Sequence, residues 1–281
     1  MENQQPNPLS RYFRQPAIYL KLPSDGQWWQ PGSLDLPDNR ELPIYPMTAR
    51  DEIILKTPDA LMNGQGMVDV IQSCVPNIKN AWACPSVDLD ALLIAIRLAT
   101  YGNSMDFEST CTKCNSKNLH GIDLTEPLGA IQCPDFGNYV RYKDLNIKLK
   151  PQNYKQISEA GQITYEEQRI NSALIDQEMP EAEKNRMLTE SVKRLIDLGI
   201  RACSNSTEYI EATGQKVVER EFIDQFYSNA EAEVIKLLQS KNTEITEQSR
   251  IPPFNLQCES CKETYQAELT FDYSNFFAQG F

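Results

Sequence analysis

Residues 111–114 read CTKC and residues 258–261 read CESC, and these two stretches decide the fold that the sequence predicts. In each stretch, a two-residue spacer lets the chain turn so that both thiolates face one ion. Two thiolates supply half of the tetrahedron that zinc prefers, so the two pairs together complete one site. The predicted ligands are Cys111, Cys114, Cys258 and Cys261. Because four protein ligands leave no position for a water molecule, we predict one structural Zn²⁺ rather than a catalytic one.

The sequence around each cysteine pair indicates a β-hairpin. Met105 and Phe107 precede the first pair, and apolar side chains alternate with polar ones from Tyr265 to Phe271 after the second. Two such hairpins that face each other form a zinc ribbon. Residues 115–257 lie between the pairs, but each doubling of a loop adds only about 0.6 kcal/mol to the cost of closing it. Structural zinc contributes on the order of 10 kcal/mol, so the predicted site joins remote parts of the chain.

Two other interpretations of the cysteine pairs stay open on the sequence alone. One is that the pairs are unrelated surface turns. The other is thiol–disulfide exchange, which needs an exposed cysteine of low pKa at the start of a helix, whereas these pairs lie between predicted strands. The remaining cysteines are predicted to be unreactive. Cys74 and Cys203 fall on apolar helix faces and are predicted core thiols, while Cys84 and Cys133 each precede a proline.

The composition of the 281-residue chain predicts a globular protein with a sizeable core, since 41% of the residues are hydrophobic and 23% are charged. Acidic residues outnumber basic ones 39 to 27, which argues against general nucleic-acid binding. No apolar run reaches the roughly 18 residues of a membrane span, and the amino terminus lacks a secretion signal. The protein is therefore expected to stay where it is made, with reduced cysteines. With His120 as the one histidine and no phosphate-binding loop, neither an enzyme nor a small-molecule site is predicted.

Hydrophobic periodicity places the main elements. Residues 88–101 form a helix that is apolar nearly all round, so it is predicted to be the buried core helix, ended by Gly102. Thr48 is predicted to cap a short helix, and Glu231 to complete a capping box in a helix that follows residues 228–229. Further strands are predicted at residues 17–22, 41–47, 139–142 and 145–149, and strand character runs from 254 to 271. Further helices are predicted to begin near residue 65, to span 154–175 and to begin near residue 180. A hairpin is predicted around residues 213–214.

The predicted fold class is α+β, a mixed core with a zinc-ribbon-like four-cysteine site and a helical insertion. The core comprises residues 17–150 and 251–281, the insertion comprises residues 151–250, and residues 1–16 form an extended arm that is either disordered or docked along a neighbour. Phe276, Phe277 and Phe281 near the carboxyl terminus either fold back onto the sheet of this chain or bind a partner, because exposed aromatic side chains anchor interfaces.

These pieces, in this order, resemble the baseplate hub subunit family of T-even-like, contractile-tailed bacteriophages. The matching stretches are AIYLKLPSDG (17–26), IYPMTARDE (44–52), IQSCV (71–75), DLDALLIAIRLATYG (88–102) leading into CTKC, and CESC followed by the FDYSNFF finish (271–277). The similarity covers most of residues 17–124 and 251–277. The chain departs from the family in its long amino-terminal arm and in having Asn115 and Lys262 where such knuckles often carry glycine.

The resemblance implies a non-enzymatic, structural hub subunit that acts through contacts with other phage baseplate and tail proteins. It places the protein in the host cytoplasm during assembly and in the tail baseplate of the virion. It also assigns Cys111, Cys114, Cys258 and Cys261 to the family's two facing cysteine turns. Two alternatives stay open. One is a transient hub-assembly factor that is absent from the virion, and the other is a zinc-ribbon protein that binds nucleic acid.

Overall fold

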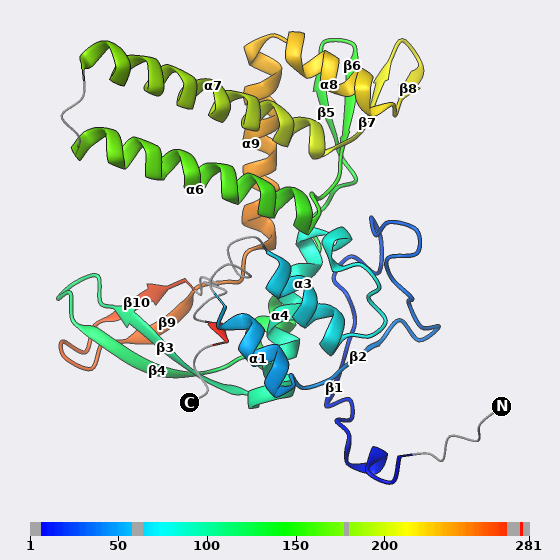
Figure 1. The fold of residues 1–281 in the computed structure, drawn as a ribbon, viewed down its shortest axis with the longest axis vertical. Coiled ribbons are helices and arrows are strands. Elements are labelled where there is room, and N and C mark those ends of the chain that lie inside the picture. Colours follow the sequence, from blue (N-terminus) through cyan, green and yellow to red (C-terminus); the bar gives the residue numbers. More distant parts are fainter. Residues whose placement is uncertain (1–6, 58–63, 177–179, 269–275, 278–281) are drawn as a thin grey trace.

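The computed structural model describes residues 7–57, 64–176, 180–268, 276 and 277. It confirms the predicted α+β class, with helices and small antiparallel sheets. Figure 1 shows a lower body that carries α1, α3, α4 and two hairpins, and an upper body that carries α6 to α9 and a four-stranded sheet. No helix among the described residues is long and apolar enough to cross a membrane.

The lower body is built around α4 (Ser86–Tyr101), the predicted core helix. Its apolar side chains point in every direction and are buried on every side, because other elements surround the helix. Elements packed directly on it include β1 (Ile18–Leu20), β2 (Leu42–Ile44), α3 (Gln65–Cys74) and α5 (Thr125–Ala130), while α1 (Ala49–Leu55) and the 3-10 turn η2 (Ala81–Ala83) pack on α3. The predicted cap of α1 is confirmed, since the backbone amide of Asp51 donates to Thr48 Oγ1 at 3.3 Å.

A buried carboxylate at the start of α4 fixes the loop that connects β1 to β2. Asp88 is fully buried and accepts hydrogen bonds from the Ser24 amide (2.8 Å), the Ser24 hydroxyl (2.5 Å) and Trp29 Nε1 (2.8 Å). Burial raises the pKa of Asp88, while the bonds from Ser24 and Trp29 act in the opposite direction. The loop therefore depends on one side chain of the core helix for its position.

The upper body has its own apolar core, formed by a sheet with the order β5-β6-β7-β8 and by helices packed on it. The strands are β5 (Tyr139–Tyr142), β6 (Leu145–Leu149), β7 (Thr207–Ala212) and β8 (Gln215–Val217), all antiparallel. The domain boundary predicted after residue 150 does not match this sheet. Strands β5 and β6 come from the stretch assigned to the lower core, but they pair with β7 of the insertion, because their inward side chains Val140 and Ile147 pack in the second core.

Four helices complete the upper body, namely α6 (Tyr154–Asp176), α7 (Glu181–Asn205), α8 (Arg220–Asn229) and α9 (Ala232–Ser249). The predicted capping box of Glu231 is wrong, and α8 was not predicted. Glu231 immediately precedes α9, but its side chain accepts hydrogen bonds from Tyr142 Oη (2.8 Å) and Lys143 Nζ (2.6 Å) rather than from the helix. It thereby joins the start of α9 to the turn after β5.

The two bodies are joined by backbone pairing where α4 and α6 begin. The Ser86 amide donates to the Gln152 carbonyl and the Tyr154 amide donates to the Cys84 carbonyl, each at 2.8 Å. Val87, in the first turn of α4, packs in the core of the upper body. The core helix therefore contributes to both cores.

We expect Asp88→Ala to lower the free energy of unfolding by about 3–5 kcal/mol, because it leaves the two buried donors of Ser24 and the partly buried Trp29 Nε1 without their acceptor. Asp90→Ala is the matched control on the same helix. Burial raises the pKa of Asp90 to about 6, so the charged carboxylate is disfavoured there, and its removal is expected to leave stability unchanged or higher. Urea unfolding followed by circular dichroism measures both. An Asp88→Ala protein within about 1 kcal/mol of the unsubstituted chain would contradict the assigned role.

Candidate metal centre

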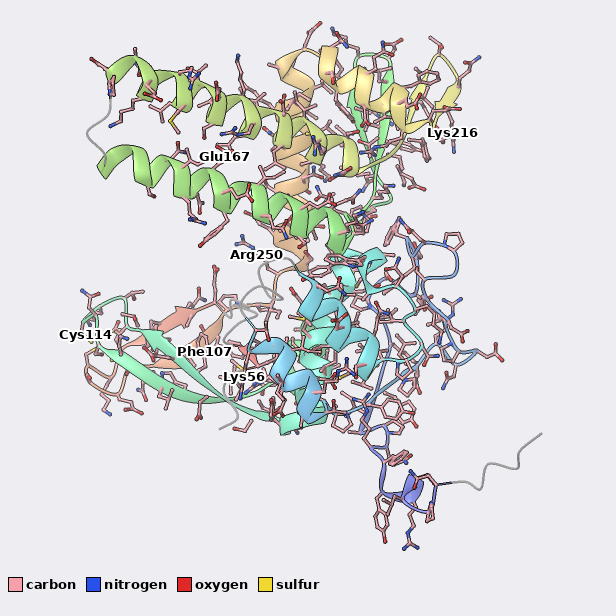
Figure 2. All side chains as sticks on the ribbon, viewed as in Figure 1. Lys56, Phe107, Cys114, Glu167, Lys216 and Arg250 are labelled. Carbon is pink, nitrogen blue, oxygen red and sulfur yellow. The ribbon has the colours of Figure 1, made fainter. Side chains whose placement is uncertain are left out.

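The four predicted ligands come together at the tips of two hairpins. The first hairpin is β3 (Ser104–Thr110) with β4 (Lys117–Asp123), and the second is β9 (Phe254–Gln257) with β10 (Thr264–Ala267). Each cysteine pair lies in the turn between its two strands. Figure 2 shows Cys114 at the far end of the β3–β4 hairpin, away from the core helices.

The two turns have the same backbone geometry. The Cys111 amide donates to the Ser116 carbonyl (2.9 Å), and the Cys258 amide donates to the Glu263 carbonyl (2.8 Å). The residue after each second cysteine adopts a left-handed conformation, with φ of 56° at Asn115 and 61° at Lys262. Both positions thus take the conformation that glycine adopts most easily, although neither is glycine. The two cysteine turns therefore adopt the same conformation without glycine at these positions.

The sulfur atoms of the two turns form one cluster. All four Sγ atoms lie within 4.8 Å of one another. Across the hairpins, Cys111 Sγ lies 3.7 Å from Cys261 Sγ, and Cys114 Sγ lies 3.6 Å from Cys258 Sγ. These separations are far longer than the roughly 2.05 Å of a disulfide bond, so the cysteines are free thiols in an arrangement that can hold a metal ion. The interpretation as two unrelated surface turns is therefore wrong.

Hydrogen bonds at the cluster favour negative charge on Cys114 and Cys258. The Ser116 hydroxyl lies 3.0 Å from Cys114 Sγ and 3.1 Å from Cys258 Sγ. The backbone amide of Cys261 and the Ser116 hydroxyl lower the pKa of Cys258 to about 5. The Glu263 backbone lowers the pKa of Cys261, but desolvation and hydrogen bonds with the other three thiols outweigh it and raise that pKa to about 12. A cation bound to all four sulfurs would displace the protons that remain on them.

A buried asparagine connects the two turns. Asn118 on β4 is 3% exposed, and its Oδ1 accepts the Glu259 amide of the second turn at 2.9 Å. Its Nδ2 donates to the Ser116 carbonyl of the first turn at 3.0 Å. Asn118 therefore sets the position of one cysteine pair relative to the other. An exposed ion pair between Lys113 and Glu263 (2.6 Å) also crosses the turns, but such pairs contribute little.

Tyr265 on β10 packs beneath the sulfur cluster and ties the strands together. It is 5% exposed and contacts the buried cysteines Cys111 and Cys258. Its hydroxyl lies 2.6 Å from Ser109 Oγ and 3.3 Å from His120 Nε2. Sequence reasoning identified the cysteines but missed Ser116, Asn118 and Tyr265 as their supports. The available signal was a polar side chain at position 118, on the inward face of a strand that also carries Ile122.

Comparison with known proteins matches the sequence of this chain to one family. The family model described as T4 bacteriophage base plate protein matches residues 18–278, which is most of the chain. The chain belongs to this family. No curated protein and no solved structure matches it. Membership supports a structural role in a phage baseplate, a location in the tail, and contacts with other baseplate or tail proteins.

The other residues singled out in this baseplate protein lie apart from the metal centre. Phe276 and Phe277 are 4% and 5% exposed and pack in the lower core, and the buried Arg97 donates to the Phe276 carbonyl. The structure therefore places them in the first of the two predicted arrangements, folded back on this chain, where they are not exposed anchors. Phe281 lies outside the described residues. Cys74 and Cys203 are buried thiols, as predicted.

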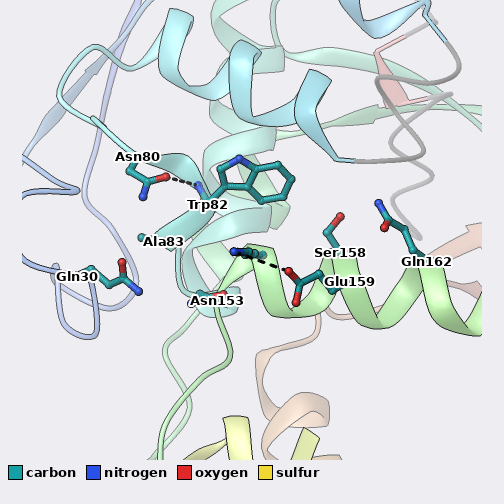
Figure 3. A pocket seen from close by; sticks show the side chains of 9 residues that line it. Gln30, Asn80, Trp82, Ala83, Asn153, Ser158, Glu159 and Gln162 are labelled. Atoms are coloured by element: carbon teal, nitrogen blue, oxygen red, sulfur yellow. Dashed lines mark hydrogen bonds and ion pairs between the residues drawn. The ribbon is translucent and has the colours of Figure 1, made fainter. Parts of the chain in front are cut away.

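A cavity of about 530 Å³ lies beside α6, between the two bodies. Figure 3 shows the side chains that line it, among them Gln30, Asn80, Trp82 and Asn153. The Lys155 ammonium and the Glu159 carboxylate in its wall are paired with each other at 3.9 Å. The lining residues include several amides but no cysteine or histidine, so this cavity lacks the groups of the metal centre.

We expect Asn118→Ala to lower the free energy of unfolding by about 1–2 kcal/mol, because it removes the acceptor of the Glu259 amide and one of the two hydrogen bonds to the Ser116 carbonyl. Asn255→Ala is the matched control, since the side chain of Asn255 is exposed and makes one weak contact with Gln266 at 3.4 Å. Thermal unfolding of both variants by circular dichroism is the measurement. Equal melting temperatures for the two variants would show that Asn118 does not hold the turns together.

Proposed function

We propose that this chain is a structural hub subunit of a contractile phage tail baseplate. In this proposal one Zn²⁺ links its two hairpins, and the protein acts through protein–protein contacts. The match to the base plate family over residues 18–278 is the observation that carries the proposal. Residues 111–114 and 258–261 both fall within that match. The four-thiol cluster supplies a reason for the rigidity that such a part needs, because it fastens two hairpins that are remote in sequence.

The geometry of the sulfurs suits zinc. Four ligands at a Zn–S distance of about 2.3 Å in a tetrahedron are separated from one another by about 3.8 Å. The two cross-hairpin separations of 3.7 and 3.6 Å are close to this value. Zinc would supply a fixed, redox-inactive link there, held by Cys111, Cys114, Cys258 and Cys261. The same four residues leave no ligand position for a substrate, which fits a structural role.

Neither remaining interpretation of the cysteines is favoured by the described structure. Thiol–disulfide exchange needs a pair at the start of a helix, whereas both pairs lie in turns between strands. Nucleic-acid binding needs clustered cations, but the chain carries a formal charge of −12. Around the cysteine turns, Lys113 and Lys117 are each paired with a glutamate, which reduces the positive charge that phosphate would meet.

Purified protein is expected to contain about one zinc ion per chain, and Cys258→Ser is expected to lose both the metal and several kcal/mol of stability. Cys133→Ser is the matched control, because Cys133 is a partly buried thiol outside the cluster. Inductively coupled plasma mass spectrometry measures the zinc, and thermal unfolding measures the stability. A full complement of zinc in Cys258→Ser would refute the shared site.

The protein is expected in purified, DNA-filled particles as a component of the tail. Quantitative mass spectrometry of gradient-purified virions gives its copy number relative to the other tail proteins. Its absence from mature tails, together with its presence in unfinished baseplates, would replace the hub subunit with the alternative of a transient assembly factor. Absence from both would remove the baseplate proposal altogether, whatever the zinc content.

A further inference from the structure

The amino-terminal arm exposes a group of apolar side chains beside an unpaired cation. Leu9, Tyr12 and Phe13 are 60%, 69% and 57% exposed, and they flank the short 3-10 turn η1 (Ser10–Tyr12). Arg11 stacks on the Tyr12 ring, 4.7 Å from its centroid, and donates to the Tyr12 hydroxyl at 2.7 Å. Among the described residues, no carboxylate pairs with Arg11. Clustered tyrosine, phenylalanine and arginine side chains are those that dominate the energy of protein interfaces.

The base of the arm is fixed to the lower body, so the exposed group is held outward. Arg14 donates through Nη1 to the Pro46 carbonyl and through Nη2 to the Ser73 carbonyl, each at 2.7 Å, and it lies 3.5 Å from the Asp51 carboxylate. Figure 1 shows η1 extending away from the lower body beyond this attachment. Because the attachment limits the directions that the arm can take, less conformational entropy is lost when the arm binds a partner.

The opposite end of the molecule presents a surface of complementary composition. Val218 and Phe222, at the start of α8, are 59% and 58% exposed. Glu219 and Glu221 are exposed beside them. The one acidic residue of α8 that forms an ion pair is Asp224, which pairs with Arg220, so the two glutamates keep unpaired charges among the described residues. We name Val218, Glu219, Glu221 and Phe222 the acidic α8 surface.

We propose that the arm of one copy of this chain docks on the acidic α8 surface of a second copy. The apolar side chains of the arm would pack against Val218 and Phe222, while Arg11 would meet the two glutamates. η1 and α8 lie at opposite ends of the longest axis, so Leu9 to Phe13 do not reach the α8 surface of their own chain (Figure 1). The contact joins two different surfaces, so it is heterologous and links copies head to tail into a ring or an open row.

The size of the contact limits its strength. A few aromatic and aliphatic side chains bury on the order of several hundred Å² in total, which is below the roughly 1,200 Å² of stable complexes. The formal charge of −12 also makes whole chains repel each other, although salt near 0.15 M screens charges beyond about 8 Å. Association is therefore weak and dependent on concentration, and it becomes significant where other tail proteins hold the copies close together.

Sedimentation equilibrium of the full chain at 0.15 M salt, from about 10 to 500 μM, tests the proposal. The average mass is expected to rise above the 32.0 kDa of one chain as the concentration increases. Arg11→Glu and Glu221→Lys, which place like charges across the contact, are each expected to weaken association at least tenfold. Tyr12→Ala is expected to weaken it similarly, whereas Tyr19→Ala, an exposed tyrosine away from the arm tip, is the matched control and is expected to leave it unchanged.

Mixing the two charge variants gives the decisive outcome. In an equimolar mixture, the arm altered by Arg11→Glu meets the α8 surface altered by Glu221→Lys, and the unaltered arm meets the unaltered surface. The residue at position 11 then faces an opposite charge at position 221 in both contacts, although Glu219 is unaltered, so association is expected to recover most of the strength that each variant alone has lost. Circular dichroism and zinc content show beforehand that each variant is folded.

The proposal is overturned by any one of three results. These are an unsubstituted chain that stays monomeric over the whole concentration range, normal association of Arg11→Glu, and a mixture that fails to recover. None of these outcomes bears on the baseplate role or on the zinc site, so the proposal can fail while the proposed function stands.

Discussion

The meeting of four cysteine side chains from residues 111–114 and 258–261 is the constraint on which the arrangement of the two hairpins depends. It fastens the β9–β10 hairpin, which the chain reaches only after completing the upper body, to the β3–β4 hairpin that follows the core helix. The two hairpins are separate two-stranded sheets, and such ribbons are marginally stable alone. Asn118 between the turns and Tyr265 beneath the sulfurs hold the hairpins together, and the proposed zinc would add its own binding energy.

The core helix α4 carries the second constraint, because its two ends serve different parts of the molecule. At its start, Asp88 holds the β1–β2 loop and Val87 enters the upper core. Near its end, Arg97 holds the backbone of Phe276. The carboxyl-terminal part of the chain thus contacts earlier parts of the lower body at two places, the sulfur cluster and the buried phenylalanine pair. A protein fastened at both places presents a fixed outer surface, which suits a part built into a larger assembly.

The surfaces that remain available for partners lie at the ends of this framework. The arm and the acidic α8 surface combine exposed apolar groups with charges of opposite sign that form no ion pair within the described part of the chain. By contrast, the carboxyl-terminal phenylalanines at 276 and 277, which also suggested an interface from composition, are used inside the chain. The position of an aromatic residue near a terminus does not predict that it is exposed. Here Arg97 binds the Phe276 carbonyl, and both phenylalanine rings pack in the lower core.

The sequence by itself determined the two cysteine pairs, the core helix, the cap at Thr48 and the α+β class, because each depends on spacing or periodicity within a few residues of the chain. The pairing of the hairpins was also accessible, since a metal site needs four ligands and each turn offers two. Tertiary structure alone decided that β5 and β6 join the sheet of the insertion, and that Glu231 binds Tyr142 and Lys143 rather than capping α9. It also decided that Asn118 bridges the turns. These outcomes depend on which remote surfaces meet, and local patterns do not encode that choice.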